Sequence, residues 1–289
     1  MNVYDIITER ILKEIEKGTL PWHQPWKSVN GEEAQNLVSK KGYRGINRFL
    51  LSHLPYARPY YLTYKQAGDL GGTVKKGEHG TPVIFWKRNT YTKMASDGTQ
   101  SEENGFMLRY YTVFNVEQCD GLRQSPPEIV PIEGQVIDTM AQAEALVDAY
   151  AQRPTITHIA QNRAYYQPST DSIVLPERTQ FVSSAEYYST LFHELTHSTG
   201  HKTRLNRPTL VDASYFGSQN YSKEELVAEM GAAFLCGEAG IENEAALKNS
   251  ASYLDGWRKK LHADSKLVIQ AAAQAQKAAD HILGKTWSE

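Results

Sequence analysis

The segment SSAEYYSTLFHELTHSTG, residues 183 to 200, restricts the fold more than any other stretch of the chain. Ser183 followed by Glu186 is the pattern of a capping box at a helix start, and Gly200 is a residue type that commonly ends helices. The apolar residues between them recur at helical spacing and would bury one side of the helix: Tyr188, Leu191, Phe192 and Leu195. The segment therefore predicts an amphipathic helix that carries the string HELTH.

Two histidines of this helix, His193 and His197, are one turn apart and project from the same side, so both imidazoles can bind one metal ion. Glu194 lies about 100° further round the helix, too far to be a third ligand but well placed to take a proton from a metal-bound water. Cys119 and Cys236 are too few for a cysteine site. The alternative is an ordinary helix with three polar residues.

A second predicted helix, YSKEELVAEMGAAFLCGEAG (221–240), offers a third ligand. Glu225 and Glu229 are four residues apart on one face and follow the second histidine by 28 and 32 residues, enough for the chain to turn back. Glu225 has a competing structural role as the capping-box partner of Ser222, in which case Glu229 is the candidate ligand. His201 is a further candidate, although the first helix is expected to end before it. Zinc suits such a site, and manganese is the alternative ion.

The stretch upstream of the first helix, DSIVLPERTQF (171–181), is expected to be an edge strand above the metal. This expectation rests on a resemblance of the HELTH helix to those of zinc peptidases, in which an extended substrate pairs with such a strand. Three tyrosines, Tyr187, Tyr188 and Tyr221, are candidates for stabilising an oxyanion, and the sequence favours none of them.

The first part of the chain is basic although the whole chain has a net charge of -2. Residues 1–125 hold 17 Lys and Arg against 13 Asp and Glu, whereas residues 126–289 hold 14 against 20. Aromatic and basic residues alternate in PWHQPWK, GYRGINR, PYYLTYK, VIFWKR and LRYY. Bases of single-stranded DNA stack on aromatic faces while cations follow the phosphates, so the pattern indicates single-stranded DNA as a partner. The competing interpretation is that most of these aromatics form a core.

The expected elements divide the chain into an N-terminal α+β domain (1–125), a proline-containing linker (126–138) and a second α+β domain (139–289). The first domain begins with a helix over residues 3–17. It continues with a strand and helix in PYYLTYKQAGDLG, and with strands TPVIFWKRNTYT and FMLRYYTVFNVEQ joined by the polar loop MASDGTQSEENG. The second domain adds helices in TMAQAEALVDAYAQ and SKLVIQAAAQAQKAADHILG, and two short strands in AYYQPSTDSIVLP.

Several classes of protein are disfavoured by what the sequence lacks. No apolar run approaches the roughly 18 residues of a membrane span, and the charged N-terminal stretch has no signal-peptide core, so a cytoplasmic protein with no membrane partner is expected. GDLGGTVKKGEHG lacks the GKS or GKT ending of a phosphate-binding P-loop, so no nucleotide cofactor is expected and the segment predicts turns that present Lys75 and Lys76.

The helices with HELTH and EELVAE resemble the gluzincin metallopeptidases, a class of zincins. That resemblance implies that Glu225 is the third ligand and that Glu229 accepts a hydrogen bond from the far nitrogen of His193 or His197. The chain as a whole resembles plasmid antirestriction proteins of the ArdC type. The blocks that carry this resemblance are DIITERILKEIEKGTLPWHQPW, YRGINRFLL, YLTYKQAGDLGGTVKKGEHGTPVIFWK, VFNVEQCDGL, YYSTLFHELTHSTGHKTRLNR and YSKEELVAEMGAAFL.

The ArdC resemblance implies an N-terminal domain that binds single-stranded DNA, also similar to the first domain of some plasmid primases, followed by a zincin-like metallopeptidase domain. It implies protection of incoming plasmid DNA from host restriction during conjugation, with a host protein as a further possible substrate. The residues carried over as candidate DNA contacts are Trp22, Trp26, Tyr43, Arg44, Asn47, Tyr64, Lys65, Lys75, Lys76 and Lys87. The alternatives are a plain metallopeptidase whose basic half docks an acidic substrate, and a protein that shields DNA and has a structural or inactive metal site.

Overall fold

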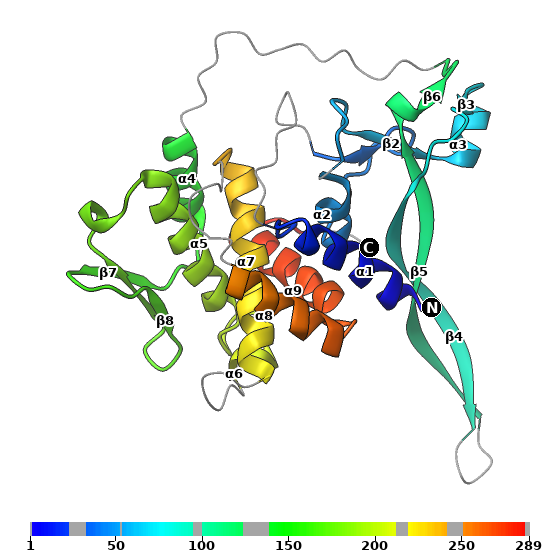
Figure 1. Cartoon of the computed structure of the whole chain (residues 1–289). Helices are drawn as coiled ribbons and strands as arrows, with labels where there is room; N and C mark the ends of the chain where they lie inside the picture. Colours follow the sequence, from blue (N-terminus) through cyan, green and yellow to red (C-terminus); the bar gives the residue numbers. More distant parts are fainter. Residues whose placement is uncertain are drawn as a thin grey trace.

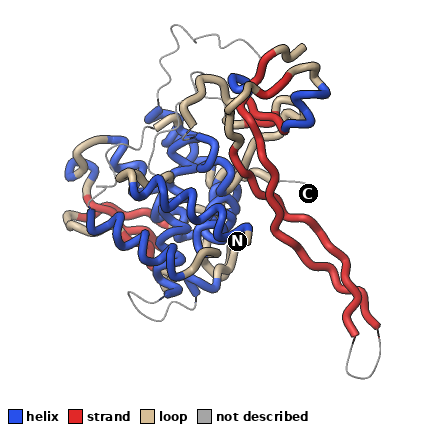
Figure 2. The backbone as a smooth tube through the Cα atoms, turned by 45° about the vertical axis from the view of Figure 1, so that its right-hand side comes forward, coloured by secondary structure: helices blue, strands red, loops and turns tan. Residues whose placement is uncertain are grey.

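The computed structural model describes residues 2–22, 33–52, 54–94, 100–123, 139–211, 219–241 and 251–286. It places a helical body beside a mixed sheet, from which a long two-stranded ribbon projects away from the body (Figures 1 and 2). Helices and strands occur in both halves of the chain, as the α+β prediction requires. None of the helices described is both long and apolar enough to cross a membrane.

The N-terminal sheet has the strand order β1-β2-β5-β4, with bounds β1 Gln35–Asn36, β2 Tyr60–Thr63, β4 Thr81–Met94 and β5 Gln100–Asn115. Strand β1 is parallel to β2, whereas the other pairs are antiparallel. A two-stranded sheet of β3 (Thr73–Val74) and β6 (Cys119–Asp120) lies beside helix α3 (Tyr64–Asp69). The predicted strand and helix of PYYLTYKQAGDLG are thereby confirmed as β2 and α3.

The β4–β5 ribbon is longer than the sequence suggested. Pairing continues without a break from Thr81↔Val113 to Met94↔Gln100, so most of the predicted hairpin loop 94–105 is strand. The predicted strand TPVIFWKRNTYT ended at Thr92, and the polar run SEENG (101–105) was assigned to the loop, although it pairs with residues 89–93. A ribbon that projects into solvent needs only the backbone ladder and β-branched or polar side chains.

The second sheet has the order β7-β9-β8, built from β7 Thr155–Ile159, β8 Tyr165–Gln167 and β9 Ser172–Pro176. The two short strands predicted in AYYQPSTDSIVLP are confirmed as β8 and β9. The predicted edge strand is wrong, since β9 is the central strand: it pairs in parallel with β7 and antiparallel with β8. The backbone of Ser172–Val174 is therefore already paired on both sides and cannot receive an extended peptide there.

The helices of the second half are α4 Thr139–Ala149, α5 Ser184–Thr199, α6 Pro208–Val211, α7 Gln219–Ala239, α8 Ala251–Ala263 and α9 Leu267–Ile282. Strand β7 and helix α8 were not predicted from the sequence. Helix α5 has the predicted N-cap, because the Ser183 side chain accepts from the Glu186 backbone N–H. The capping box predicted for Ser222 and Glu225 is wrong, because α7 begins at Gln219 and both residues lie inside the helix.

The first two helices, α1 (Val3–Glu16) and α2 (Ile46–Ser52), pack into the same hydrophobic core as helices of the second half. Phe49 of α2 stacks on Phe234 of α7 with ring centroids 4.7 Å apart, and Trp22 meets Trp257 of α8 edge to face at 6.2 Å. The two predicted domains thus share one core at this place. The predicted linker 126–138 lies outside the described residues.

Candidate metal centre and nucleic-acid interface

The packing of α5 against α7 brings the polar residues of the two helices together. A side chain at Gly231 of α7 would collide with Thr196 of α5, because a Cβ there would lie 2.4 Å from the Thr196 Cγ2. Glycine at this position therefore permits the close approach of the two helices. His193 and His197 of α5 then lie close to Glu225 of α7.

His193, His197 and Glu225 gather at this contact, with one candidate ligand atom from each within 4.8 Å of the others. The two Nε2 atoms are 3.1 Å apart, and each lies 3.6 Å from an oxygen of Glu225. Ligand atoms bound at 2.0–2.1 Å around a tetrahedral zinc ion are about 3.3 Å apart, so these separations suit one ion of that size. The His193 and Glu225 side chains remain 24 % and 27 % exposed, which leaves one side of the centre open.

Glu224 contacts the His197 ring on the side that faces away from His193. This contact was not predicted from the sequence. The Glu224 Oε1 atom lies 3.3 Å from His197 Nδ1. Burial would raise the pKa of Glu224, but hydrogen bonds from His197 and Arg207 lower it to about 2. The carboxylate is therefore an acceptor at neutral pH, and His197 Nδ1 carries the hydrogen and donates, which leaves the Nε2 lone pair for an ion.

Arg207 in turn holds Glu224. Its guanidinium donates through Nε and Nη2 to the two Glu224 oxygens at 3.1 and 2.5 Å, and both side chains are nearly completely buried. The same guanidinium donates to the Thr199 hydroxyl at 2.5 Å and to the Thr196 carbonyl at 2.8 Å, at the C-terminal end of α5. Arg207 thus fixes Glu224 and closes the helix that carries both histidines.

Glu229 does not occupy the position predicted for it. Its described hydrogen bonds come from the Trp22 indole N–H at 2.9 Å and from the Tyr253 hydroxyl of α8. The brace on His197 is instead Glu224, one residue before Glu225 rather than one turn after it. The spacing rule for a helix face favoured Glu229, but the rotation of α7 about its own axis decides which carboxylate reaches which histidine, and no local pattern fixes that rotation.

The negative charge around His193 is strong. Burial lowers the pKa of His193, but its hydrogen bond with Glu225 and the charges of Glu194, Glu225 and Glu229 together raise it to about 9. Glu194 is buried, with only 6 % of its surface exposed. A site with this surplus of carboxylates favours a cation over a neutral or anionic ligand.

The alternative residues lie elsewhere. His201 follows α5, where its Nδ1 contacts the Thr203 hydroxyl at 2.8 Å, outside the cluster of three ligand atoms. Tyr187 and Tyr188 point the other way, toward His158 and Glu144 respectively. Neither tyrosine is therefore placed to stabilise an oxyanion at this centre. The side chain of Tyr221 lies outside the description.

Four candidate DNA contacts are engaged within the protein. Trp22 is fully buried and Tyr43 is 6 % exposed, so neither ring is available on the open surface for stacking against a base. Arg44 forms an ion pair with Asp280 of α9. The Asn47 side chain exchanges two hydrogen bonds of 2.8 Å with the Ile84 backbone, which fastens α2 to β4. Trp22, Arg44 and Asn47 therefore have a structural role, since their polar groups are bonded within the protein, and the Tyr43 ring is buried.

Other candidates are exposed. Tyr64 has 68 % of its surface free, and Lys65, Lys76 and Lys87 are exposed as well. Lys75 is exposed but donates to the Glu117 carbonyl at 2.8 Å. Lys75 and Lys76 stand before a turn at Gly77, whose φ is +89°, in agreement with the predicted turns. Trp26 lies outside the described residues.

The projecting ribbon carries exposed aromatics that are outside the predicted list of DNA contacts, and Phe85 among them was expected to be buried. Phe85, Trp86, Phe106 and Tyr110 are 40 to 63 % exposed. Register places Phe85 directly opposite Arg109, and Arg88 opposite Phe106, on the two faces of the ribbon. Strict alternation along VIFWKR and FMLRYY could have shown that each face receives both an aromatic and a cation.

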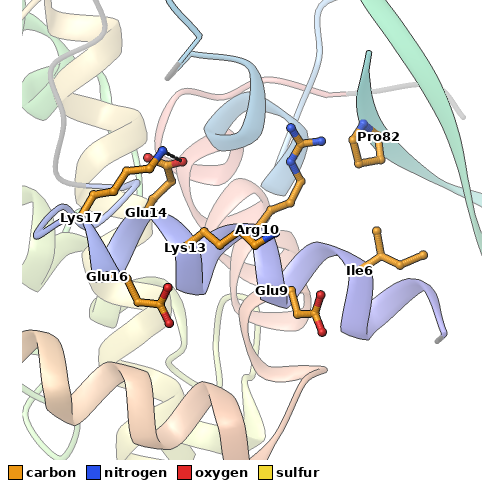
Figure 3. A pocket seen from close by; sticks show the side chains of 8 residues that line it. All are labelled: Ile6, Glu9, Arg10, Lys13, Glu14, Glu16, Lys17 and Pro82. Atoms are coloured by element: carbon orange, nitrogen blue, oxygen red, sulfur yellow. Dashed lines mark hydrogen bonds and ion pairs between the residues drawn. The ribbon is translucent and has the colours of Figure 1, made fainter. Parts of the chain in front are cut away.

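A separate pocket of about 650 Å³ lies between α1 and β4 (Figure 3). Its lining mixes both signs of charge, and Lys17 already pairs with Glu14 at 2.8 Å. The residues that line it are Ile6, Glu9, Arg10, Lys13, Glu14, Glu16, Lys17 and Pro82. This balance of charge offers no preference for a polyanion and no convergent ligand set for a metal, so the pocket is not part of either candidate site.

The fold and the α5–α7 centre define a zincin-like domain joined to an α+β N-terminal region. Residues 141–274 match the family described as zincin-like metallopeptidase, and residues 1–114 match the N-terminal domain of anti-restriction factor ArdC. Two solved structures are similar over nearly the whole chain: the antirestriction protein ArdC of plasmid R388, metal-free and Mn(II)-bound. Both are 35 % identical and cover 98 % of this chain, and the chain covers 97 and 98 % of theirs, with TM-scores of 0.73 and 0.74.

The chain belongs to the ArdC family of antirestriction proteins. Among curated proteins it is 38 % identical to a DNA primase TraC of Escherichia coli over 97 % of its own length, and 37 % identical to a second TraC primase. It spans only 20 and 27 % of those primases. It is also 33 % identical to the uncharacterized protein y4eC of Sinorhizobium fredii, of which it covers 91 %.

Proposed function

We propose that this chain binds single-stranded DNA through its N-terminal region, protects incoming plasmid DNA from restriction in a bacterial host cell during conjugation, and holds a divalent metal ion in its zincin-like domain. The observation that carries the metal part is the convergence of His193, His197 and Glu225 within 4.8 Å. The DNA part is supported by the ribbon, where cations and aromatics face each other across the strands.

The exposed ribbon suits a flexible strand better than a duplex. Its aromatics are open to solvent, and an unpaired base can stack on them only when it is free of a partner strand. Arg88, Arg109 and Lys87 are exposed beside these rings and can follow the phosphates. The ribbon contacts by themselves read no particular sequence.

For the metal we favour zinc, which suits two histidines and one carboxylate. Manganese is the alternative, since Mn(II) is bound in the solved structure of the R388 relative. When bound, the ion would polarise a substrate carbonyl and lower the pKa of its water. The chain supplies three further parts of the site. Glu224 holds His197 in the tautomer that carries its hydrogen on Nδ1, and Glu225 completes the set of ligands. Glu194 is the group that would take and return a proton. A host protein is the proposed substrate class of this hydrolysis.

Binding of a labelled oligothymidylate, followed by fluorescence anisotropy across a salt series, tests the DNA part. We expect the logarithm of affinity to fall linearly with the logarithm of salt concentration, with a slope of about -0.7 per phosphate contacted. Replacing Phe85 and Phe106 together with serine should weaken binding, whereas Val182→Ser, at an exposed position of the other half, is a matched control. No binding by the wild type at low salt would exclude the DNA part.

The metal part is tested by metal analysis and by antirestriction assays in parallel. His193→Ala should lose the ion, whereas Glu194→Gln should keep it and lose hydrolysis. Full antirestriction by Glu194→Gln would assign protection to DNA shielding rather than to proteolysis. Unchanged metal content in His193→Ala would show that the ion binds elsewhere.

A further inference from the structure

A small pocket opens beside the N-terminal sheet, where the turn after β1 meets the end of β2 and strand β5. Its volume is about 340 Å³, within the range of sites that hold a small organic group. Polar and aromatic side chains from four separate elements line it: Asn36, Ser39, Lys41, Tyr43, Gln66 and Tyr111. It is distant in sequence from the zincin-like residues and has no part in the metal centre.

The two amides of the pocket have already used their acceptor atoms. Asn36 Oδ1 accepts from the Val38 and Ser39 backbone N–H groups at 3.1 and 2.9 Å, and Gln66 Oε1 accepts from the Thr63 N–H at 2.8 Å. The amides also bond to each other, at 3.0 and 3.3 Å. The Gln66 amide nitrogen has a second N–H that these bonds do not use, and the Asn36 amide also interacts with the Tyr43 hydroxyl, so the pocket offers donors rather than acceptors.

The Tyr43 hydroxyl is the buried group that this arrangement leaves unsatisfied. It has no hydrogen-bond partner among the atoms that the structure describes, although it is almost inaccessible. Burial raises the pKa of Tyr43, and the Asn36 amide and the Tyr111 hydroxyl are the polar groups that interact with its hydroxyl across the pocket. Buried polar groups without a partner are uncommon in proteins, and one that lines a pocket beside further donors indicates a ligand with acceptor atoms.

The mouth of the pocket is continuous with one face of the ribbon. Tyr111 pairs with Val83, and the next residues on that face are Phe85 opposite Arg109 and Lys87 opposite Met107. Tyr111 is half-buried and its ring packs against exposed Phe85 with centroids 5.5 Å apart. Lys41 is exposed at the opposite rim. A DNA strand that follows this face of the ribbon would therefore reach the pocket, with a cation on either side.

We propose that the pocket receives one unpaired base of the bound single strand, with the Tyr43 hydroxyl and the amide N–H groups against the polar edge of the base and Lys41 near the adjoining phosphate. This assignment rests on the proposed binding of single-stranded DNA. The donors suit a base edge that presents carbonyl oxygens, so thymine, with two carbonyls, should fit better than adenine, whose exocyclic amine is a donor. A paired base cannot enter, because its polar edge is already engaged.

The test compares two labelled strands of about 16 nucleotides, one of thymidylate and one of equal charge whose sugars carry no bases. Wild type should bind the thymidylate strand more tightly than the abasic one, and more tightly than oligodeoxyadenylate. Tyr43→Phe should lower thymidylate affinity roughly three- to tenfold and leave abasic affinity unchanged. This variant keeps the buried ring and its edge-to-face contact with Tyr61. Tyr165→Phe, which removes an exposed hydroxyl from β8, is the matched control and should change neither affinity.

The outcomes separate the pocket from the general DNA interface. If Tyr43→Phe binds both strands as tightly as wild type does, or weakens both equally, the pocket does not receive a base, while the ribbon interface stands. If wild type binds neither strand at low salt, the proposed function itself fails. Tyr111→Leu gives a second reading, since loss of the ring should weaken thymidylate binding roughly five- to hundredfold and abasic binding much less.

Discussion

Arg207 and Glu224 form a buried ion pair, and the same Glu224 carboxylate reaches His197 Nδ1 at 3.3 Å. The pair joins the loop after α5 to α7, so the orientation of a candidate ligand depends on a residue ten positions further along the chain. A buried carboxylate without a cation would be costly, and Arg207 removes that cost while it also holds two carbonyls at the end of α5. Arg207 therefore positions Glu224, and Glu224 positions His197.

Replacing Glu224 should weaken metal binding without removing a ligand. We expect Glu224→Gln to lower metal affinity roughly 10- to 100-fold, because His197 loses a charged acceptor that fixes its tautomer. Competition with a metal-sensitive dye measures this affinity directly. Asp171→Asn is the control, since Asp171 pairs with Arg204 in the same region and does not contact either histidine. Equal affinity in Glu224→Gln and wild type would contradict the positioning role.

Replacing Arg207 should chiefly affect stability. Arg207→Met leaves Glu224 buried without its cation and removes the donor to the end of α5, so the free energy of unfolding should fall by about 3–5 kcal/mol. Urea unfolding followed by circular dichroism provides the measurement. The surface pair of Arg178 with Glu144 is the comparison, and Arg178→Met should cost less than about 1 kcal/mol. If the two variants lose similar amounts of unfolding free energy, burial does not make the Arg207 pair more important for stability than the surface pair.

Stability should depend on pH through Glu224. Its pKa is lowered from 4.5 to about 2, so the folded protein binds the proton more weakly than the unfolded chain does. The resulting stabilisation is complete above the unfolded pKa and is lost as the pH falls through the folded pKa. Between about pH 4.5 and 2 the free energy of unfolding should drop by about 3 kcal/mol from this group. Unfolding curves of Glu224→Gln should lack this part of the drop; an identical pH dependence would argue against it.

The close contact of α5 and α7 should be sensitive to a single methyl group. Gly231→Ala places a Cβ 2.4 Å from the Thr196 Cγ2, so the helices must separate. We expect a loss of about 1–3 kcal/mol in stability and weaker metal binding, because Glu225 moves away from the histidines. The double variant Gly231→Ala, Thr196→Ala should recover part of both. Additive effects of the two substitutions would indicate that the contact is not responsible.

Trp22 should matter for folding rather than for stacking on DNA. Trp22→Phe keeps most of the buried ring but removes the N–H that donates to Glu229. A buried acceptor that loses a donor costs about 1–3 kcal/mol, which thermal unfolding can detect. Affinity for single-stranded DNA should stay unchanged in the folded variant. A loss of DNA affinity with normal stability would restore Trp22 as a contact.

The site was predictable where it depends on a single helix. His193 and His197 share a face because a helix repeats every 3.6 residues, and that geometry holds in any fold that keeps the helix. The same reasoning from face and spacing assigned the wrong role to Glu229 and overlooked Glu224. Which carboxylate faces which histidine depends on the rotation of α7 against α5, a long-range contact in which Gly231 lies close to Thr196 and Arg207 bonds to Glu224.

The sequence by itself determined the main local elements and the two-part character of this protein, since capping residues, apolar spacing and strand alternation act within a few residues. Tertiary structure decided what long-range packing controls: that α1 and α2 complete the core of the zincin-like half, that β9 is a central strand, and that Trp22 and Tyr43 are buried. Aromatic residues are equally suited to a core and to a base-stacking surface. Only the packing of the whole chain distinguishes Trp22, enclosed against Trp257, from Phe85 and Phe106, exposed on the ribbon.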